Sequence, residues 1–315
     1  MGKKYLGIDI GGTTIKFGVF DESGTLLGKW HIPTRKEHRG AYILPDIIHS
    51  IRNGIPGLLS EVESPAGIGI GVPGPVLDAS VVTRGTNLGW GVLNIREYFE
   101  KEFPGIPVRA ANDVNAATIG EFWKGSGKGA ENGMMVAIGT GIGGGVILDG
   151  HLVNGVFGSA GEVGHFMMRE DETEVCGCGK KGCLEQYASA TGIANEMKKL
   201  LLSSDEPSIL RGKDDLTAKD VFDAAKQGDP AALKIADQTG MLLGKALSYV
   251  SCVIDPGLFI IGGGVSLAGG FLLDRIAKNY KKTAFPPSRD ATFRLAALGS
   301  DAGIYGDVKL VLPEQ

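Results

Sequence analysis

Near its start the chain reads Tyr5-Leu-Gly-Ile-Asp-Ile-Gly-Gly-Thr-Thr-Ile-Lys-Phe-Gly-Val-Phe20. Two apolar runs flank a polar Gly/Thr turn, which is typical of a β-hairpin. The same design returns at Met134-Met-Val-Ala-Ile-Gly-Thr-Gly-Ile-Gly-Gly-Gly-Val-Ile-Leu148. This repeat predicts an α/β protein built from two related units, each of which opens with a hairpin.

Hydrophobic periodicity predicts the remaining elements. Between the hairpins we expect a helix near 41–53, a strand near 66–72, a helix near 94–102, a strand near 107–111 and a helix from about 113 to 123. After residue 185 the pattern is mainly helical, and we expect helices near 185–202, 217–227, 230–252, 266–280 and 301–311, with a strand at Leu258–Ile261.

The predicted elements fall into two lobes. We expect a small N-terminal lobe, residues 1–112, which a C-terminal helix within about 300–315 completes, and a large lobe, residues 113–299. A chain of 315 residues is long enough for two domains with a substantial core.

Composition excludes several classes of protein. Charged residues make up 22% of the chain, the net charge is −4 and there is no basic block, so we expect no nucleic-acid partner. No run of 18 apolar residues occurs and the N-terminus lacks a signal-peptide pattern, so we expect no membrane association. Few cysteines, clustered at metal-ligand spacing, fit the reducing cytosol, and we expect a cytoplasmic protein.

The first hairpin turn carries a phosphate-binding pattern. In Asp9-Ile-Gly-Gly-Thr-Thr-Ile-Lys16 an acid at a strand end precedes two glycines, two hydroxyls and a lysine. Glycines let backbone N–H groups reach phosphate oxygens, threonine hydroxyls add donors, and the acid could hold Mg²⁺ through water. An ordinary hairpin turn explains the glycines but not the other residues. We therefore predict nucleotide contacts by Asp9, Gly11, Gly12, Thr13, Thr14 and Lys16.

Two further glycine runs extend this prediction. The second hairpin turn contains Gly139, Thr140 and Gly141, and a third run, Gly262, Gly263 and Gly264, follows a strand and precedes a helix. The second turn matches G-x-G-x-x-G, but a strand follows it, so it is not a Rossmann fingerprint, and no P-loop motif occurs. Each run alone is weak evidence, but together they predict a nucleotide cleft.

Asp113 is the candidate chemical residue. It lies in Arg109-Ala-Ala-Asn-Asp-Val-Asn-Ala-Ala-Thr-Ile-Gly-Glu121, a short strand followed by polar residues and a helix. One interpretation is helix capping by Asn112 or Asp113, with Asn115 sharing the role. The other makes Asp113 a general base for a hydroxyl that attacks a phosphoryl group, because acids at carboxyl ends of strands face the ligand crevice in open α/β sheets.

Three of the four cysteines occur in Cys176-Gly-Cys178-Gly-Lys-Lys-Gly-Cys183, and His165 lies eleven positions before the first. His165, Cys176, Cys178 and Cys183 form a Cys₃His set, which indicates structural zinc. A disulfide is an alternative to the metal site, although it would leave one of the three cysteines unpaired. A flexible loop with reduced thiols is the third interpretation. Glu162, His165 and Glu185 could hydrogen-bond the hydroxyls of a sugar ring.

Taken together, these motifs resemble the ROK family, and within it the glucokinase-like sugar kinases of bacteria. The resemblance rests on Asp9-Ile-Gly-Gly-Thr13, Gly71-Val-Pro-Gly74, Thr86-Asn-Leu-Gly-Trp90, Asn112-Asp113, Gly139-Thr-Gly141, Gly161-Glu-Val-Gly-His165, the cysteine cluster through Glu185, and Gly262-Gly-Gly264.

The resemblance implies a two-lobed actin/hexokinase-like (ribonuclease H-like) fold with a duplicated core and a zinc-stabilised loop. It implies ATP-dependent phosphorylation of a hexose, glucose foremost, at O6, with ATP, Mg²⁺ and structural Zn²⁺. Asp113 would deprotonate the 6-hydroxyl, and Asn87, Asn112, Glu162, His165 and Glu185 would hold the sugar. His165 would give one ring nitrogen to the metal and the other to the sugar. A homodimer or a higher homo-oligomer is the family expectation.

Other functions stay open within the same family. N-acetylmannosamine, N-acetylglucosamine, mannose, allose and fructose are alternative substrates, and polyphosphate is an alternative donor. A sugar-sensing repressor would carry an N-terminal DNA-binding domain, for which the first strand leaves no room here.

The sequence departs from the family in two places. The gap from His165 to Cys176 is one residue longer than expected and acidic, and Ile304-Tyr-Gly-Asp307 stands where a small Gly-Ala-Ala-like patch is usual. The first departure concerns the path of the loop, and the second the packing of the last helix.

Overall fold

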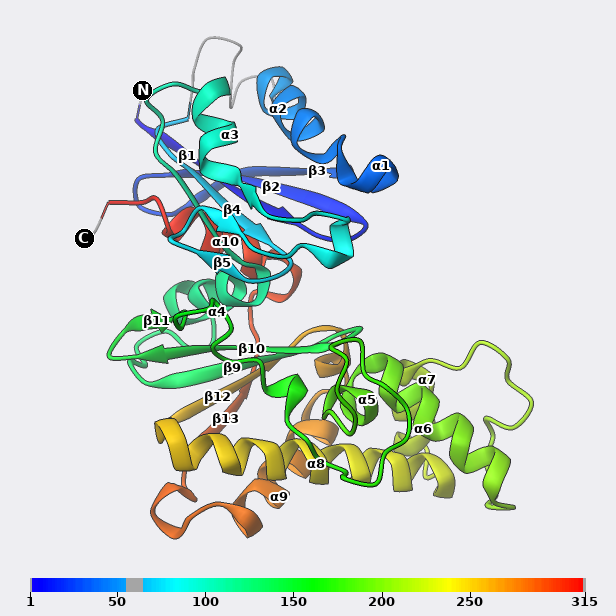
Figure 1. Ribbon diagram of the computed structural model, residues 1–315. Helices are drawn as coiled ribbons and strands as arrows, with labels where there is room; N and C mark the ends of the chain where they lie inside the picture. Colours follow the sequence, from blue (N-terminus) through cyan, green and yellow to red (C-terminus); the bar gives the residue numbers. More distant parts are fainter. Residues whose placement is uncertain (1, 55–64, 314–315) are drawn as a thin grey trace. The chain divides into compact units, whose positions relative to one another are not determined.

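The computed structural model describes residues 2–54 and 65–313 (Figure 1). The chain divides into two compact units, a first unit of Met1–Gly129, Leu152–Ala160 and Ser300–Gln315, and a second unit of Ala130–His151 and Gly161–Gly299. The C-terminal segment belongs to the first unit. The sequence-based division starts the large lobe at residue 113, whereas contacts group residues 113–129 with the first unit; the functional division into lobes stays a prediction.

The first unit contains a five-stranded sheet in the order β3-β2-β1-β4-β8. β1, β2 and β3 are antiparallel neighbours, and β4 and β8 continue the sheet in parallel with β1. Their bounds are β1 Lys4–Ile10, β2 Thr14–Asp21, β3 Leu26–Pro33, β4 Ile68–Val72 and β8 Val108–Asn112.

Alternate residues of these strands face two different cores, as the two-residue period of a strand requires. Leu6 and Ile8 of β1 pack in one apolar cluster with residues of α2 (Ile43–Asn53) and α3 (Ile95–Glu102). Tyr5 packs in another with Ile304 and Val308 of α10 (Ala302–Lys309). The face of β1 that carries Tyr5 therefore lies under α10.

α10 also packs on α4 (Asp113–Lys124), and glycines allow the close approach. A Cβ atom at Gly306 would lie 1.6 Å from the carbonyl oxygen of Ala116, and one at Gly120 would lie 2.2 Å from that of Ala302. Any side chain at these positions would push the helices apart. The contact ties the start of α4 to the sheet through α10.

The sheet of the second unit has the order β11-β10-β9-β12-β13 and repeats the design of the first. β9 and β10 form an antiparallel hairpin, and β12 and β13 follow in parallel. The bounds are β9 Gly133–Ile138, β10 Ile142–Leu148, β11 His151–Val153, β12 Leu258–Gly262 and β13 Thr292–Leu295. Two sheets with matching strand order confirm the duplicated α/β core.

Most predicted elements are present, and the two hairpins are confirmed. The remaining helices are α1 Glu37–Gly40, α5 Glu185–Ala188, α6 Ala190–Ser203, α7 Ala218–Lys226, α8 Pro230–Ile254 and α9 Gly270–Thr283. The structure also contains elements that the sequence did not predict, namely β3, β11, β13 and a small sheet of β5 Val76–Leu77, β6 Val81–Val82 and β7 Leu93–Asn94. Within the described part of the chain, none of the helices combines the length and apolar character that crossing a bilayer requires.

Two helix predictions were wrong in detail. The stretch 185–202 is not one helix, because Ser189 is extended and its hydroxyl accepts a hydrogen bond from the Gly192 N–H, which starts α6 anew. The stretch 266–280 begins as a short 3-10 helix, Gly264–Ala268, and α9 starts only after Gly269, whose φ of 72° interrupts the helix.

Candidate functional site

The first hairpin turn holds Asp9 and Lys16 opposite each other. They are register partners on β1 and β2, and Lys16 Nζ lies 3.7 Å from Asp9 Oδ2. Lys16 also donates a hydrogen bond of 2.7 Å to the carbonyl oxygen of Ser300. Burial raises the pKa of Asp9, and the Lys16 ammonium opposes that shift. The Lys16 ammonium next to the Asp9 carboxyl group favours its ionised form, and an ionised carboxylate beside a lysine suits a hydrated metal ion and a phosphate.

The backbone of the turn is closed by its own hydrogen bonds. The Gly11 N–H donates to the carbonyl oxygen of Thr14, and the Thr34 hydroxyl donates to that of Gly11. Thr13 is exposed, while Gly11, Gly12 and Thr14 are partly exposed. The turn thus presents an accessible backbone and hydroxyls, as a phosphate site requires.

Asn112 and Asp113 lie where β8 ends and α4 begins. The Asn112 side-chain oxygen accepts hydrogen bonds from the N–H groups of Val114 and Asn115, so the capping interpretation is confirmed for this residue. Its amide nitrogen donates to the carbonyl oxygen of Gly74. Asp113 Oδ1 accepts a hydrogen bond of 2.9 Å from the Val114 N–H. Asp113 is half-buried at the first helical position, so the cap fixes where its carboxylate stands.

Asn87 lies on a 3-10 helix, Thr86–Leu88, and its side chain is exposed. Its neighbours Gly85 and Trp90 pair in an isolated bridge that closes this loop. The loop belongs to the first unit, and the proposed sugar contact of Asn87 stays a prediction.

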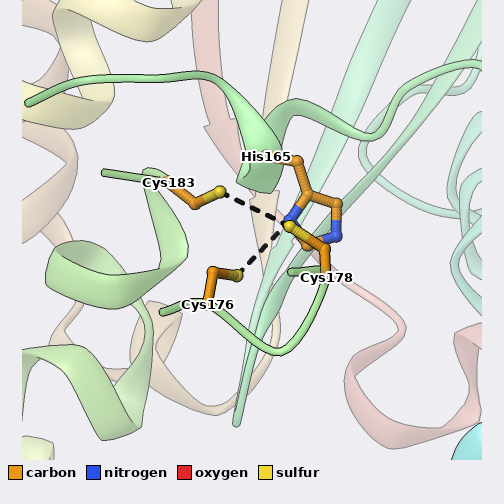
Figure 2. Close-up of side chains that lie close together, drawn as sticks. All are labelled: His165, Cys176, Cys178 and Cys183. Carbon is orange, nitrogen blue, oxygen red and sulfur yellow. Dashed lines mark hydrogen bonds between the residues drawn. The ribbon is translucent and has the colours of Figure 1, made fainter. Parts of the chain in front are cut away.

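In the second unit the predicted Cys₃His set comes together. Figure 2 shows the side chains of His165, Cys176, Cys178 and Cys183 converging, and one ligand atom from each lies within 4.8 Å of the others. The Cys178 and Cys183 sulfurs are 3.7 Å apart, and Cys176 Sγ lies 3.9 Å from His165 Nδ1. All the cysteines are free thiols, so the disulfide alternative is not formed.

Local backbone geometry brings the sulfurs together. Bridges pair Val175 with Lys181 and Met167 with Cys183, and the chain turns back through Gly179 (φ 89°) and Gly182 (φ 72°). Both values lie in the left-handed region, which glycine adopts at no steric cost. Three sulfurs and one imidazole nitrogen suit a four-coordinate site for a metal such as zinc.

The sugar-ligand candidates of this unit surround the same histidine. His165 Nε2 lies 3.9 Å from Glu162 Oε2, and His165 Nδ1 lies 3.8 Å from Glu185 Oε1. Burial raises the pKa of Glu162, the nearby Glu185 adds to the rise, and His165 opposes it. Nδ1 thus faces the sulfurs while Nε2 faces Glu162, so the ring presents its two nitrogens to different neighbours.

Glu185 joins the cysteine cluster to the second hairpin turn. Its Oε1 lies 3.1 Å from Cys176 Sγ, and its Oε2 accepts a hydrogen bond from the Ile142 N–H. A Cβ atom at Gly141 would come 2.7 Å from Oε2, so glycine is needed there. The Ala190 N–H, at the start of α6, donates to the carbonyl oxygen of Gly139. The turn at Gly139–Gly141 and the cluster are therefore parts of one structure.

The acidic loop before Cys176 is anchored by three side chains. Arg169 pairs with Glu196 at 2.9 Å and lies over the ring of Tyr187. The Tyr187 hydroxyl donates a 2.7 Å hydrogen bond to Glu172, and Lys199 pairs with another acid of the loop, Glu174. The loop is thus attached to α5 and α6, and the expectation that it is one residue longer than in the family stays a prediction.

The third glycine run lies beside a cavity of about 300 Å³. Gly264 lines it, whereas Gly262 and Gly263 do not. A Cβ atom at Gly262 would meet the Met135 side chain at 2.6 Å, and one at Gly263 the Ile138 backbone at 2.5 Å. Close packing therefore explains these two glycines, and their nucleotide contacts stay a prediction.

Other residues of this cavity were missed by sequence reasoning. They come from α7, from the start of α6 and from the turn after β12, and include Ala190, Ala218, Lys219, Phe222, Val265 and Ala268. Thr217 caps α7 in a reciprocal capping box with Asp220, which the sequence does contain. That signal fixes the helix start, but nothing in it points to a ligand.

Comparisons with known proteins cover nearly the whole chain. A family model described as "ROK family" matches residues 5–314. A glucokinase of Halalkalibacterium halodurans is 39% identical over 99% of this chain and 96% of its own length. The structure of a Streptomyces griseus ROK family glucokinase with glucose and AMPPNP has a TM-score of 0.79 and 33% identity, and covers 98% of both chains. A xylose repressor of Caldicellulosiruptor bescii is 31% identical over 70% of this chain and 55% of its own length.

Proposed function

Because this chain belongs to the ROK family, we propose that it is a hexose kinase that transfers the γ-phosphoryl group of ATP to O6 of glucose. The observation that carries this proposal is its end-to-end similarity, in sequence and in fold, to glucokinases, one of which was solved with glucose and AMPPNP. The actin/hexokinase-like α/β fold with two matching sheets is in keeping with it.

In the proposed reaction Asp113 is the general base. Phosphoryl transfer needs an oriented nucleophile and stabilised charge more than covalent help from the protein. The Asp113 carboxylate, held at the start of α4, would accept the proton of the 6-hydroxyl as its oxygen attacks the γ-phosphorus. Its fixed position favours this role, because a base must stand within hydrogen-bond reach of the proton that it takes.

Asp9, Lys16 and the first turn would bind the phosphates. Asp9 would hold Mg²⁺ through water, and the metal would neutralise charge on the phosphates. The Gly11 and Gly12 backbone, with the hydroxyls of Thr13 and Thr14, would donate hydrogen bonds to phosphate oxygens. Gly139, Thr140 and Gly141 would do the same from the second turn, and the cavity beside Gly264 would take the adenosine.

Glu162, His165 and Glu185 would hold the sugar, together with Asn87 and Asn112. Carboxylates and an imidazole can accept and donate hydrogen bonds around a ring of hydroxyls. The free face of His165 Nε2, towards Glu162, would serve the sugar. Binding of the sugar and closure of the site would exclude water from the transfer step.

We further propose that the Cys₃His set holds a structural zinc ion. A full set of four protein ligands is the form that structural zinc sites take. Metal on Nδ1 would fix the ring of His165 and so orient Nε2. The cytoplasmic location expected from cysteine usage, and the homodimer or higher homo-oligomer implied by the family resemblance, also stay proposals.

The first experiment measures ADP release with MgATP against a panel of hexoses and N-acetylhexosamines. We expect the highest kcat/KM for glucose, and a product phosphorylated at O6 by nuclear magnetic resonance. Preference for N-acetylmannosamine or fructose would change the substrate but keep the reaction. No turnover of any sugar, with either ATP or polyphosphate, would exclude a kinase and favour a sugar sensor.

Metal analysis tests the zinc proposal separately. We expect about one zinc per chain in the purified protein and much less in Cys183→Ser. Cys252→Ser is the matched control, because Cys252 lies in α8 and is not one of the four clustered residues. Equal zinc in both variants, or none in the unmodified protein, would count against the site.

A further inference from the structure

Asn154 is a polar residue that the proposed reaction does not use. It lies in the segment Leu152–Ala160, which belongs to the first unit although the chain before and after it belongs to the second. The Asn154 amide nitrogen donates a 2.8 Å hydrogen bond to the carbonyl oxygen of Val76 in β5. Its side-chain oxygen accepts one of 3.3 Å from the amide nitrogen of Asn115 in α4. Asn154 therefore links β5 to α4 through both ends of its side chain.

The Asn115 amide is difficult to explain by stability alone. Its side chain is 2% exposed, and its oxygen has no hydrogen-bond partner among the described residues. Leaving a buried polar atom without a partner costs free energy, and few such atoms occur in folded proteins. The amide nitrogen of Asn115, which donates to Asn154, is the end with a partner. The contact with Asn154 is therefore the reason that we infer for an amide at this place.

A second amide joins the same two elements. Asn112 Nδ2 donates to the carbonyl oxygen of Gly74, two residues before Val76. The Asn112 oxygen accepts from the backbone N–H groups of Val114 and Asn115. The first turn of α4 is thus bonded directly to one end of this three-residue segment, and through the side-chain pair described above to the other end.

The loop that carries Asn154 lies close against β5. Gly158 is buried with a φ of 66°, and a Cβ atom there would lie 2.9 Å from the Val76 carbonyl oxygen, the atom that accepts from Asn154. Glycine adopts this φ at no steric cost. The Ala160 N–H donates to the carbonyl oxygen of Asn154, which closes the loop on itself. The loop backbone therefore fixes where the Asn154 side chain stands.

We propose that Asn154 is a positioning residue, which acts through Asn115 to hold the first turn of α4 and with it the carboxylate of Asp113. This inference rests on the proposed function, in which Asp113 accepts the proton of the sugar hydroxyl. Asp113 Oδ1 accepts a hydrogen bond from the Val114 N–H of the same turn, so a shift of the turn moves the carboxylate. A displacement of about 1 Å caused by a distant substitution can lower a rate by about 100-fold.

The experiment measures kcat and KM for Asn154→Ala, Asn115→Ala and the double variant, with glucose and MgATP, well below the Tm of each protein. We expect kcat to fall by about 10- to 100-fold in each single variant, with the KM for glucose and for ATP within about twofold of wild type. The double variant should lose no more than the single variants, because both substitutions break the same link. Losses that multiply in the double variant would overturn the inference.

The Asp113→Asn background tests whether Asn154 acts through Asp113. The proposed base is absent there, so adding Asn154→Ala should lower the remaining kcat by less than about twofold. A merely structural role would reduce the activity in both backgrounds alike. A further loss as large as the one in the wild-type background would therefore overturn the positioning role.

Asn279→Ala is the matched control, because Asn279 is half-buried and its amide donates a 2.8 Å hydrogen bond to the carbonyl oxygen of Arg275 in α9. Its kcat should equal that of the wild type. Asn154 is also half-buried, so water can occupy the space that its side chain leaves. Asn154→Ala therefore carries the test alone if Asn115→Ala does not fold.

The outcomes separate this inference from the proposed function. A wild-type kcat in Asn154→Ala, or a change in the KM for glucose alone, would overturn the positioning role in an otherwise active kinase. A wild-type protein without kinase activity would overturn the proposed function, and the positioning role with it.

Discussion

Replacing Tyr187 with Phe removes one atom from the anchor of the loop that precedes the cysteine cluster. The Tyr187 side chain is 1% exposed, and its hydroxyl donates a 2.7 Å hydrogen bond to Glu172. This bond is the largest of the effects that lower the pKa of Glu172 to about 2. Tyr187 also lies two positions after Glu185 in α5, so the anchor supports a proposed sugar ligand.

The size of the effect follows from the type of bond. A hydrogen bond to a charged group contributes about 1.5–3 kcal/mol, but Glu172 is only partly buried and water would replace part of this bond. We therefore expect the free energy of unfolding to fall by about 1–2 kcal/mol. At about 2–4 °C per kcal/mol, the Tm should fall by roughly 2–8 °C at pH 7. The KM for glucose should rise, because α5 loses part of its support.

The pH dependence identifies the cause. Because the folded-state pKa of Glu172 is lowered, the ionised carboxylate stabilises the fold above the ordinary pKa of 4.5. That stabilisation is lost as the pH falls toward the folded-state pKa of about 2. The Tm difference between wild type and Tyr187→Phe should therefore shrink between pH 5 and pH 3.

Tyr280→Phe is the matched control for this experiment. Tyr280 is 0% exposed, and its hydroxyl donates a 2.7 Å hydrogen bond to the backbone oxygen of Ser288, which does not titrate. Tyr280→Phe should lower the free energy of unfolding by a similar amount, about 1–3 kcal/mol, and this loss should not become smaller as the pH falls. A difference for Tyr187→Phe that stays constant from pH 7 to pH 3, like that of the control, would refute the reasoning.

Two further substitutions test the packing and the nucleotide cavity. Gly306→Ala would place a methyl group 1.6 Å from the Ala116 oxygen, so it should lower the free energy of unfolding in denaturant by at least about 1–3 kcal/mol. Gly91→Ala is the control, because a Cβ atom at Gly91 has no atom within 4 Å, and it should be neutral. Equal denaturation midpoints for the two variants would contradict the close contact of α4 and α10. Gly264 has no atom within 4 Å of its would-be Cβ, so Gly264→Leu should fill the cavity and raise the KM for ATP about tenfold or more at unchanged Tm. An unchanged KM for ATP would place the adenosine elsewhere.

Local chemistry made part of the structure predictable. The two hairpins follow from apolar runs around a Gly/Thr turn, and the Cys₃His set from spacing within one loop, because both depend on residues close in sequence. The capping interpretation of Asn112 also needed only its neighbours.

Contacts that are distant in sequence set the limits of that prediction. β13 forms because Thr292–Leu295 can pair with β12, and the two-residue strands β5, β6 and β7 form only as partners in one small sheet. At the break after Ser189 the Ala190 N–H also donates a hydrogen bond to the carbonyl oxygen of Gly139, 51 positions earlier, and a helical pattern cannot reveal that contact.

The same limit holds for the site. Lys219 and Phe222 line the cavity beside Gly264 because α7 packs against the turn after β12, and nothing in their own segment indicates this. Only the fold shows that Asp307 lies against Gly71 and that neither of its side-chain oxygens has a hydrogen-bond partner among the described residues.

The central claim is that Asp113 accepts the proton of the sugar hydroxyl, and Asp113→Asn tests it most directly. Asn keeps an oxygen that can accept from the Val114 N–H, so the start of α4 should stay intact. We expect kcat for glucose phosphorylation to fall by about 10²–10⁴-fold, with the glucose Kd within a few-fold of the wild-type value by isothermal titration calorimetry. A kcat within a few-fold of wild type would contradict the account.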